Sequence, residues 1–136
     1  MAEIDYAFLA DYAKVNPTGS LTAVGASWHF LQVPALPTKH RLSIAGRVRG
    51  KVGDEAVAIE FRIQGPNDGF TISLGGELMA PPNAGYGDGK VGLLFAVDID
   101  VPLPTTGLYQ VTVVLPDADV RRRLAFEVVL PPVALP

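Results

Sequence analysis

Hydrophobic and polar residues alternate with a period of two along most of the chain after residue 40. Successive side chains of a β-strand point to opposite faces, so this period is typical of strands that bury one face. The clearest run ends at the turn-forming segment 65–69, and its apolar face consists of Val57, Ile59, Phe61 and Ile63. This pattern predicts a half-buried strand over residues 57–64.

Similar runs on both sides predict further strands. Leu42, Ile44 and Val48 mark a preceding strand, and residues 70–74 mark a following one, so the three are expected to be antiparallel neighbours. A Pro- and Gly-rich loop, 80–89, precedes a strand over 91–99. Runs at 109–115 and 124–130, joined by the turn 116–119, predict a hairpin.

The first third of the chain is different, because in residues 4–13 and 21–33 both odd- and even-numbered positions are apolar, so both faces of a strand there would be apolar. Such strands need cover on both faces, either inside the fold or from a partner. A helix over 7–14 is the alternative, since Ala, Leu and Lys favour helix. We favour the strand. With about eight strands in total, the chain is predicted to be all-β, as a two-sheet antiparallel β-sandwich of seven or eight strands.

Length and composition fit one folded domain. The chain has 136 residues, of which 49% are hydrophobic and 18% are charged, which is too apolar for a disordered protein. We expect the domain to span residues 1–130. The last six residues, 131–136, form a Pro-rich tail that cannot continue a strand, because proline has no backbone N–H.

Charge and composition exclude several classes of protein. The net charge of −3 argues against a duplex-binding protein, which is usually basic. The absence of cysteine excludes disulfides, thiolate metal sites and a cysteine nucleophile. No apolar stretch is long enough to span a membrane, and the first residues are acidic where a secretory signal is basic. A cytoplasmic location is expected.

The segment before the predicted hairpin resembles an immunoglobulin-like sandwich. Gly107-Leu108-Tyr109 precedes alternating valines, like the Gly-x-Tyr that enters the penultimate strand of those folds. The resemblance implies that Tyr109 buries its ring at a sheet corner and that its hydroxyl bonds to nearby backbone. The Cys and Trp pattern of antibody domains is absent. The resemblance therefore extends to the general sandwich only.

Over most of its length the chain also resembles a group of uncharacterised small bacterial proteins. Their first strand is similar to Tyr6-Ala7-Phe8-Leu9, and a Gly-x-Tyr lies near their C-terminus. The resemblance implies a bacterial β-sandwich protein, and it implies no activity.

Residues that could carry catalysis are few. His29 and His40 are the only histidines, a metal site needs at least three ligands, and Lys39 and Arg41 beside His40 repel a cation, so no metal site is expected. Asp98 and Asp100 share one strand face at about 7 Å, a glycosidase-like spacing, but we favour a solvated sheet face because no cleft signal accompanies them. There is no Gly-x-Ser-x-Gly, and the Gly-rich segment 85–90 departs from a phosphate-binding loop at Ala84 and after Lys90. We therefore expect no enzymatic activity and no cofactor.

Arginines are the more informative charged residues. One strand face carries Arg41, Arg47 and Arg49, and Arg62 projects in the same sense from the strand expected beside it. Such a strip can bind phosphates or carboxylates, and it can equally protect a sheet against aggregation. Tyr86, at the tip of the 80–89 loop, is the matching loop candidate for a ligand site.

These observations favour a non-enzymatic protein-interaction or structural module, with a homodimer as its simplest assembly. The excess of apolar residues near the N-terminus predicts that the interface contains Ile4, Tyr6, Phe8, Leu9 and Trp28. The alternative is a domain whose loops hold a small anion or a carbohydrate near the arginines. An enzyme that uses Asp98 and Asp100 ranks third.

Overall fold

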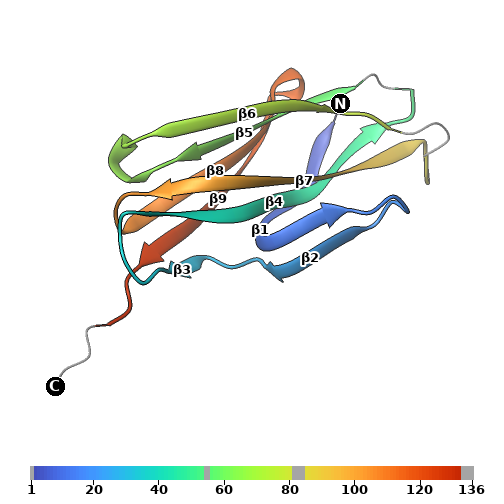
Figure 1. Ribbon diagram of the computed structural model, residues 1–136. Coiled ribbons are helices and arrows are strands. Elements are labelled where there is room, and N and C mark those ends of the chain that lie inside the picture. Colours follow the sequence, from blue (N-terminus) through green and yellow to red (C-terminus); the bar gives the residue numbers. More distant parts are fainter. Residues whose placement is uncertain (1, 54–55, 81–84, 133–136) are drawn as a thin grey trace.

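The computed structural model describes residues 2–53, 56–80 and 85–132, which form nine β-strands and two single 3₁₀ turns. This confirms the all-β prediction, and the first segment is a strand rather than a helix. Figure 1 shows two packed layers of strands. The strands are β1 (Glu3–Val15), β2 (Leu21–Ala26), β3 (Phe30–Gln32), β4 (Thr38–Lys51), β5 (Val57–Gln64), β6 (Thr71–Leu78), β7 (Lys90–Leu103), β8 (Gly107–Leu115) and β9 (Val120–Val129).

The strands form one sheet of four and one of five. Their orders are β2-β1-β4-β7 and β3-β9-β8-β5-β6. All pairs are antiparallel except β3 with β9, which is parallel. The two-sheet sandwich is confirmed, and the hairpin expected near the C-terminus is β8–β9 with its turn at 116–119. On one long side of the sandwich, the edge strands are β6 and β7.

One predicted neighbour relation is wrong. β4 does not pair with β5, because the chain changes sheets between them. β4 pairs instead with β7 along its whole length, from Thr38 opposite Leu103 to Lys51 opposite Lys90. The alternation of apolar residues fixes which face of a strand is buried, but it does not say which strand lies beside it. The β5–β6 pairing was predicted correctly.

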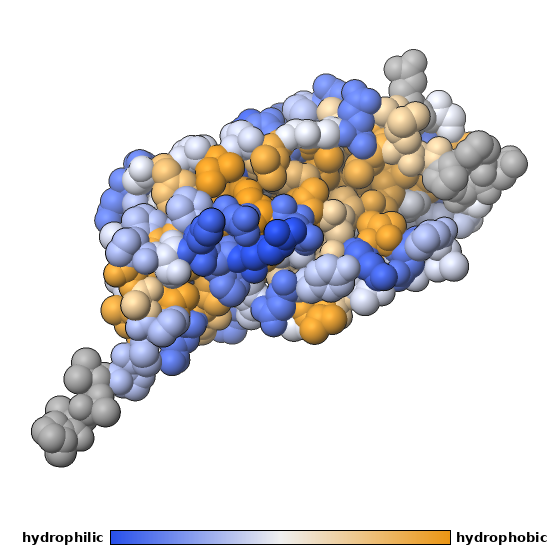
Figure 2. Space-filling model, in the orientation of Figure 1, coloured by the Kyte–Doolittle hydropathy of each residue, from blue (hydrophilic) through white to orange (hydrophobic). Residues whose placement is uncertain are grey.

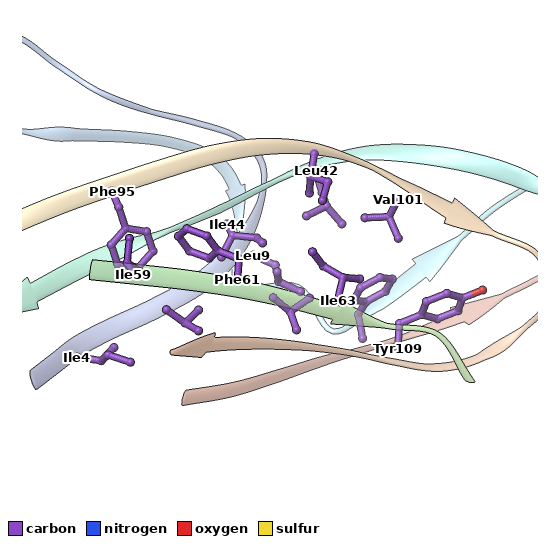
Figure 3. Close-up of a cluster of buried hydrophobic side chains, with 14 of the residues drawn as sticks. Ile4, Leu9, Leu42, Ile44, Ile59, Phe61, Ile63, Phe95, Val101 and Tyr109 are labelled. Carbon is purple, nitrogen blue, oxygen red and sulfur yellow. The ribbon is translucent and has the colours of Figure 1, made fainter. Parts of the chain in front are cut away.

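Inward side chains of both sheets form the main core (Figure 3). Several of them are fully buried, including Ile44 on β4, Ile63 on β5 and Val111 on β8. Burying one such side chain stabilises a fold by about 1.5–3 kcal/mol. The core is therefore the principal source of stability, and it holds the two sheets and their edge strands in fixed relative positions.

The apolar N-terminal strand finds most of its cover inside the fold. Ile4 and Leu9 on β1 are 7% and 3% exposed and belong to the main core. On the opposite face, Ala10 and Ala13 pack against Ala45 of β4 in a second, smaller cluster. Methyl side chains allow this close approach of backbones. Ile4 and Leu9 are thus unavailable to a partner, and their assignment to an interface is wrong.

A polar contact fixes the same region. Ser43 on β4 is 1% exposed. Its hydroxyl accepts a hydrogen bond of 3.1 Å from the backbone N–H of Ala13 and donates one to Asp98 on β7. Ser43 therefore connects β1, β4 and β7 across the outer face of the four-stranded sheet.

Tyr109 occupies a corner of the sandwich on β8. Its ring is 0% exposed and stacks on Phe126 of β9 with 5.3 Å between ring centroids. Its hydroxyl donates a hydrogen bond of 2.8 Å to the backbone carbonyl of Thr105. Trp28, which precedes β3, packs edge-on against the same Phe126 at 5.4 Å. These aromatic rings close one end of the core.

The C-terminal tail begins after β9. Pro131 and Pro132 are exposed and lie outside any strand, whereas the rest of the predicted tail, 133–136, lies outside the described residues. The same is true of 81–84 within the predicted 80–89 loop. Within the described part of the chain, no helix has the length and apolar character needed to cross a membrane.

Candidate functional site

Two of the candidate arginines are paired with acidic residues of β1. Nε of Arg47 donates to Oδ2 of Asp5 at 2.7 Å, and its Nη2 contacts the same oxygen. Arg49 donates to Oε2 of Glu3 at 2.7 Å and lies 3.6 Å from Oδ1 of Asp5. The hydrogen bond that Arg47 donates to Asp5 raises the pKa of Arg47, and the one that Arg49 donates to Glu3 raises the pKa of Arg49.

Aromatic residues gather at the same place. The guanidinium carbon of Arg47 lies 5.4 Å from the ring centroid of Tyr6, within range of a cation–π contact. Tyr6 in turn stacks on Phe8 at 6.3 Å. Tyr86 sits on a tight turn closed by two backbone hydrogen bonds with Lys90, of 2.7 and 3.0 Å. The pairing of Lys90 with Lys51 brings this turn to the end of β4, two residues from Arg49.

We call this group the Tyr6–Arg47 cluster; it consists of Glu3, Asp5, Tyr6, Arg47, Arg49 and Tyr86. It unites residues that the sequence assigned to two separate sites, a ligand site and an interface. Its two guanidinium groups face two carboxylates. The cluster therefore has no net charge with which to attract an anion, although it presents exposed tyrosine surface.

The other two candidate arginines lie elsewhere. Arg41 shares a strand with Arg47 but is six residues away, about 20 Å along β4, and it pairs with Asp98 at 3.5 Å. Arg62 is on the other sheet, where its Nε donates to Glu60 at 2.8 Å. A single strip of four arginines is therefore contradicted. Across its own sheet, Arg62 is in register with Thr112, which is in register with Arg123.

The groups considered for catalysis are also dispersed or engaged. Asp98 accepts from Ser43 and pairs with Arg41, while Asp100 is exposed. His40 contacts Trp28 edge-on at 6.3 Å, and His29 lies beside Phe30. Among residues 2–53, 56–80 and 85–132, no three His, Asp or Glu side chains are close enough together to hold a metal ion.

The remaining predicted interface residues are only partly exposed. Phe8 and Trp28 are half-buried, and both line a small hollow of about 170 Å³ between β1 and β9. Tyr6 is 37% exposed. Only Tyr6, Phe8 and Trp28 of the five predicted residues thus contribute accessible surface.

One apolar cleft among the described residues was not predicted from the sequence. It is a cleft of about 290 Å³ on the side where β6 and β7 form the two edges, and we call it the β6–β7 cleft. Figure 2 shows apolar surface gathered in a band between these strands. Its lining is Val15, Ile59, Phe61, residues 74–78 of β6 and residues 94–97 of β7.

The cleft opens directly onto the main core. Ile59, Phe61 and Phe95 line it and are 3–4% exposed, whereas Leu74 at its rim is 38% exposed. Among the residues 74–78 and 94–97 that form its walls, Glu77 is the only charged one. In the sequence, the pair Gly75-Gly76 and the neighbouring leucines are the residues that could have indicated this cleft. They indicate it only if β6 is an edge strand.

No protein-family model matches this chain, and no curated protein or solved structure matches it. The resemblance to small bacterial β-sandwich proteins accordingly stays a prediction. The candidate sites are distinguished by their own geometry.

Geometry favours the cleft over the Tyr6–Arg47 cluster. In the cluster, each charged group already has a partner, so a ligand must compete with existing ion pairs. In the cleft, apolar side chains face water at the edge of the sheet. Burying them under a partner stabilises the complex by about 25 cal/mol per Å² of apolar surface. Of these two candidate sites, the β6–β7 cleft is therefore the better suited to binding.

Proposed function

We propose that this chain is a protein-interaction module rather than an enzyme, and that it binds through the β6–β7 cleft and the adjoining edge of β6. The single observation that carries the proposal is the apolar cleft between two edge strands, which is open to water and lined at its base by core residues. Apolar grooves beside a strand edge bind extended polypeptide, because backbone hydrogen bonds give affinity while pockets accept alternate side chains.

The alternative of an anion site has less support. Arg41, Arg47, Arg49 and Arg62 all have carboxylate partners, so a bound anion would displace an existing salt bridge. Tyr6 and Tyr86 of the Tyr6–Arg47 cluster are 37% and 47% exposed and remain suitable for stacking. Protein binding at the cleft needs no such rearrangement.

Affinity capture with two matched variants tests the proposal. Leu74→Glu places a charge at the rim of the β6–β7 cleft, whereas Leu108→Glu places the same charge on β8, where the residue is 50% exposed and outside the cleft. Partners captured by the wild-type chain should be lost with Leu74→Glu and retained with Leu108→Glu, and the purified partner should bind directly with the same dependence. Equal capture by both variants, each verified as folded by its thermal transition, would contradict the proposal.

A further inference from the structure

The free edge of β6 offers backbone hydrogen-bonding groups at known positions. Gly65 N–H donates to the carbonyl of Phe70 at 3.0 Å, one step before the Gln64–Thr71 pair that begins the β5–β6 ladder. Hydrogen-bonded pairs alternate along an antiparallel ladder. The even-numbered residues of β6 therefore bond to β5, and the N–H and C=O groups of Thr71, Ser73, Gly75 and Glu77 point to the open edge.

This edge lacks the usual protection against pairing. Natural edge strands are guarded by proline, lysine, bulges or inward charges. β6 carries none of these residues except one acid, Glu77. By contrast, β7 carries Asp98, Asp100 and Pro102, and the edge strand β2 ends at positive φ angles of 59° at Gly25 and 65° at Ser27. Among the edges of the described strands, β6 is the longest uninterrupted one without a guard.

The middle of β6 is open on both faces of the sheet. A methyl group built at Gly76 would meet no atom within 4 Å, and one at Gly75 would meet its nearest neighbour at 3.9 Å. The two glycines lie between the β6–β7 cleft on the inner side and a hollow of about 330 Å³ on the outer side. Glycine inside a strand often marks a close approach by another backbone.

We propose that the partner at this edge is a second copy of the chain, whose β6 pairs antiparallel with the first β6 about a two-fold axis at Gly75. The inference rests on the proposed function and names its partner. The pairing joins two five-stranded sheets into one of ten strands. Each copy presents the same patch to the other, as a two-fold interface requires.

The register about Gly75 is chemically self-consistent. Ile72 lies opposite Leu78 of the second copy, Leu74 lies opposite Gly76, and all four are on the inner face beside the cleft. On the outer face, Ser73 lies opposite Glu77, so the only charge of each strand avoids its counterpart. This register also uses every outward N–H and C=O from Thr71 to Met79. Shifting it by two residues leaves some of them unpaired.

The C-terminal tail of another copy fits the same edge less well. Three of the seven residues from Leu130 to Pro136 are prolines, which have no N–H for a ladder. An edge-to-edge contact is at the small end of interface sizes, below about 1,200 Å². We therefore expect reversible association at micromolar concentrations.

Sedimentation velocity of the full chain from about 1 to 500 µM, the range suited to a small interface, measures the association. The mass should rise from monomer to dimer. Ser73→Pro removes an outward N–H without breaking the β5–β6 ladder and should abolish the dimer, whereas Ser73→Ala keeps the N–H and should leave it unchanged. A dimer that survives Ser73→Pro would overturn the assignment to β6.

Register is tested by disulfide formation, because the chain has no cysteine of its own. Opposite residues in a hydrogen-bonded antiparallel pair have Cα atoms about 5.5 Å apart, within disulfide range. Under mild oxidation Gly75→Cys should therefore form a linked dimer. Glu77→Cys should not, because the two residues 77 are about 13 Å apart in this register. Equal linkage of both variants would overturn the register.

A chain that stays monomeric at every concentration would overturn self-pairing. The proposed function is read out separately: capture of another protein that depends on Leu74 would then still support it. If capture is independent of Leu74 as well, both proposals fail.

Discussion

The hydroxyl of Tyr109 donates a 2.8 Å hydrogen bond to the backbone carbonyl of Thr105, four residues earlier in the chain. The bond joins the start of β8 to the segment that crosses from the four-stranded to the five-stranded sheet. The side chain is fully buried, so its hydroxyl needs a hydrogen-bond partner within the protein. The Thr105 carbonyl is that acceptor.

Replacing Tyr109 with Phe should destabilise the fold by about 1–2 kcal/mol, because the Thr105 carbonyl loses its donor at a partly buried position. Urea denaturation followed by Trp28 fluorescence measures the change. Tyr12→Phe is the control, since Tyr12 is 46% exposed, and it should change the free energy of unfolding by less than about 0.5 kcal/mol. Equal effects of the two variants would contradict the structural role of the corner.

Ser43→Ala should weaken the contact between β1 and β4. The substitution leaves the buried N–H of Ala13 without its acceptor and Asp98 without the Ser43 hydroxyl, so we expect a loss of about 1–3 kcal/mol. Chemical denaturation gives the value, with Ser73→Ala on the exposed part of β6 as the matched control. A Ser43→Ala variant as stable as the control would show that the hydroxyl does not hold the N-terminal strand.

The ion pair of Glu3 and Arg49 predicts a pH dependence. The hydrogen bond from Arg49, followed by its charge, lowers the pKa of Glu3 below the ordinary value of 4.5. A depressed carboxyl pKa stabilises the folded state above the unfolded pKa, and this contribution is lost as the pH falls through the folded value. NMR titration of the Glu3 carboxyl should give a midpoint below 4.5 that rises in Arg49→Gln. An unchanged midpoint would contradict the pairing.

Because the candidate arginines already form salt bridges with carboxylates, we predict weak anion binding. Phosphate should raise the melting temperature of the wild-type chain no more than chloride at equal ionic strength. Asp5→Asn removes the carboxylate that Arg47 and Arg49 both contact, so this variant should gain a phosphate-specific increase. A phosphate-specific increase in the wild type would instead favour the small-anion function.

Sequence alone was sufficient for the faces of the strands. The alternation from Val57 to Ile63 and from Tyr109 to Leu115 follows directly from a two-residue period, and the structure buries the expected side chains except Val57, which is partly buried. It was also sufficient for β8–β9, because a short turn leaves two strands little choice of partner.

Neighbour relations between distant strands could not be obtained in this way. The pairing of β4 with β7 joins residues that are tens of positions apart, and no local pattern encodes it. The misplacement of Arg62 follows from that limit. So does the missed cleft, because Leu74 and Gly75 become an exposed rim only when β6 is the last strand of its sheet.

The N-terminal segment shows a second limit. Apolar residues on both faces of this strand correctly predicted that both faces are covered. The sequence did not show whether a partner or the chain itself provides the cover. The small cluster around Ala10, Ala13 and Ala45 supplies much of it internally. Alanine contributes little hydrophobic area, so its packing role was difficult to recognise beforehand.

Amide hydrogen exchange along β6 in dilute solution tests the open edge most directly. The account predicts an alternating pattern: the amides of Ile72, Leu74 and Leu78 bond to β5 and exchange slowly, while those of Thr71, Ser73, Gly75 and Glu77 exchange rapidly. Slow exchange of the second group in the dilute chain would mean that the edge is already covered, and it would contradict the proposed binding surface.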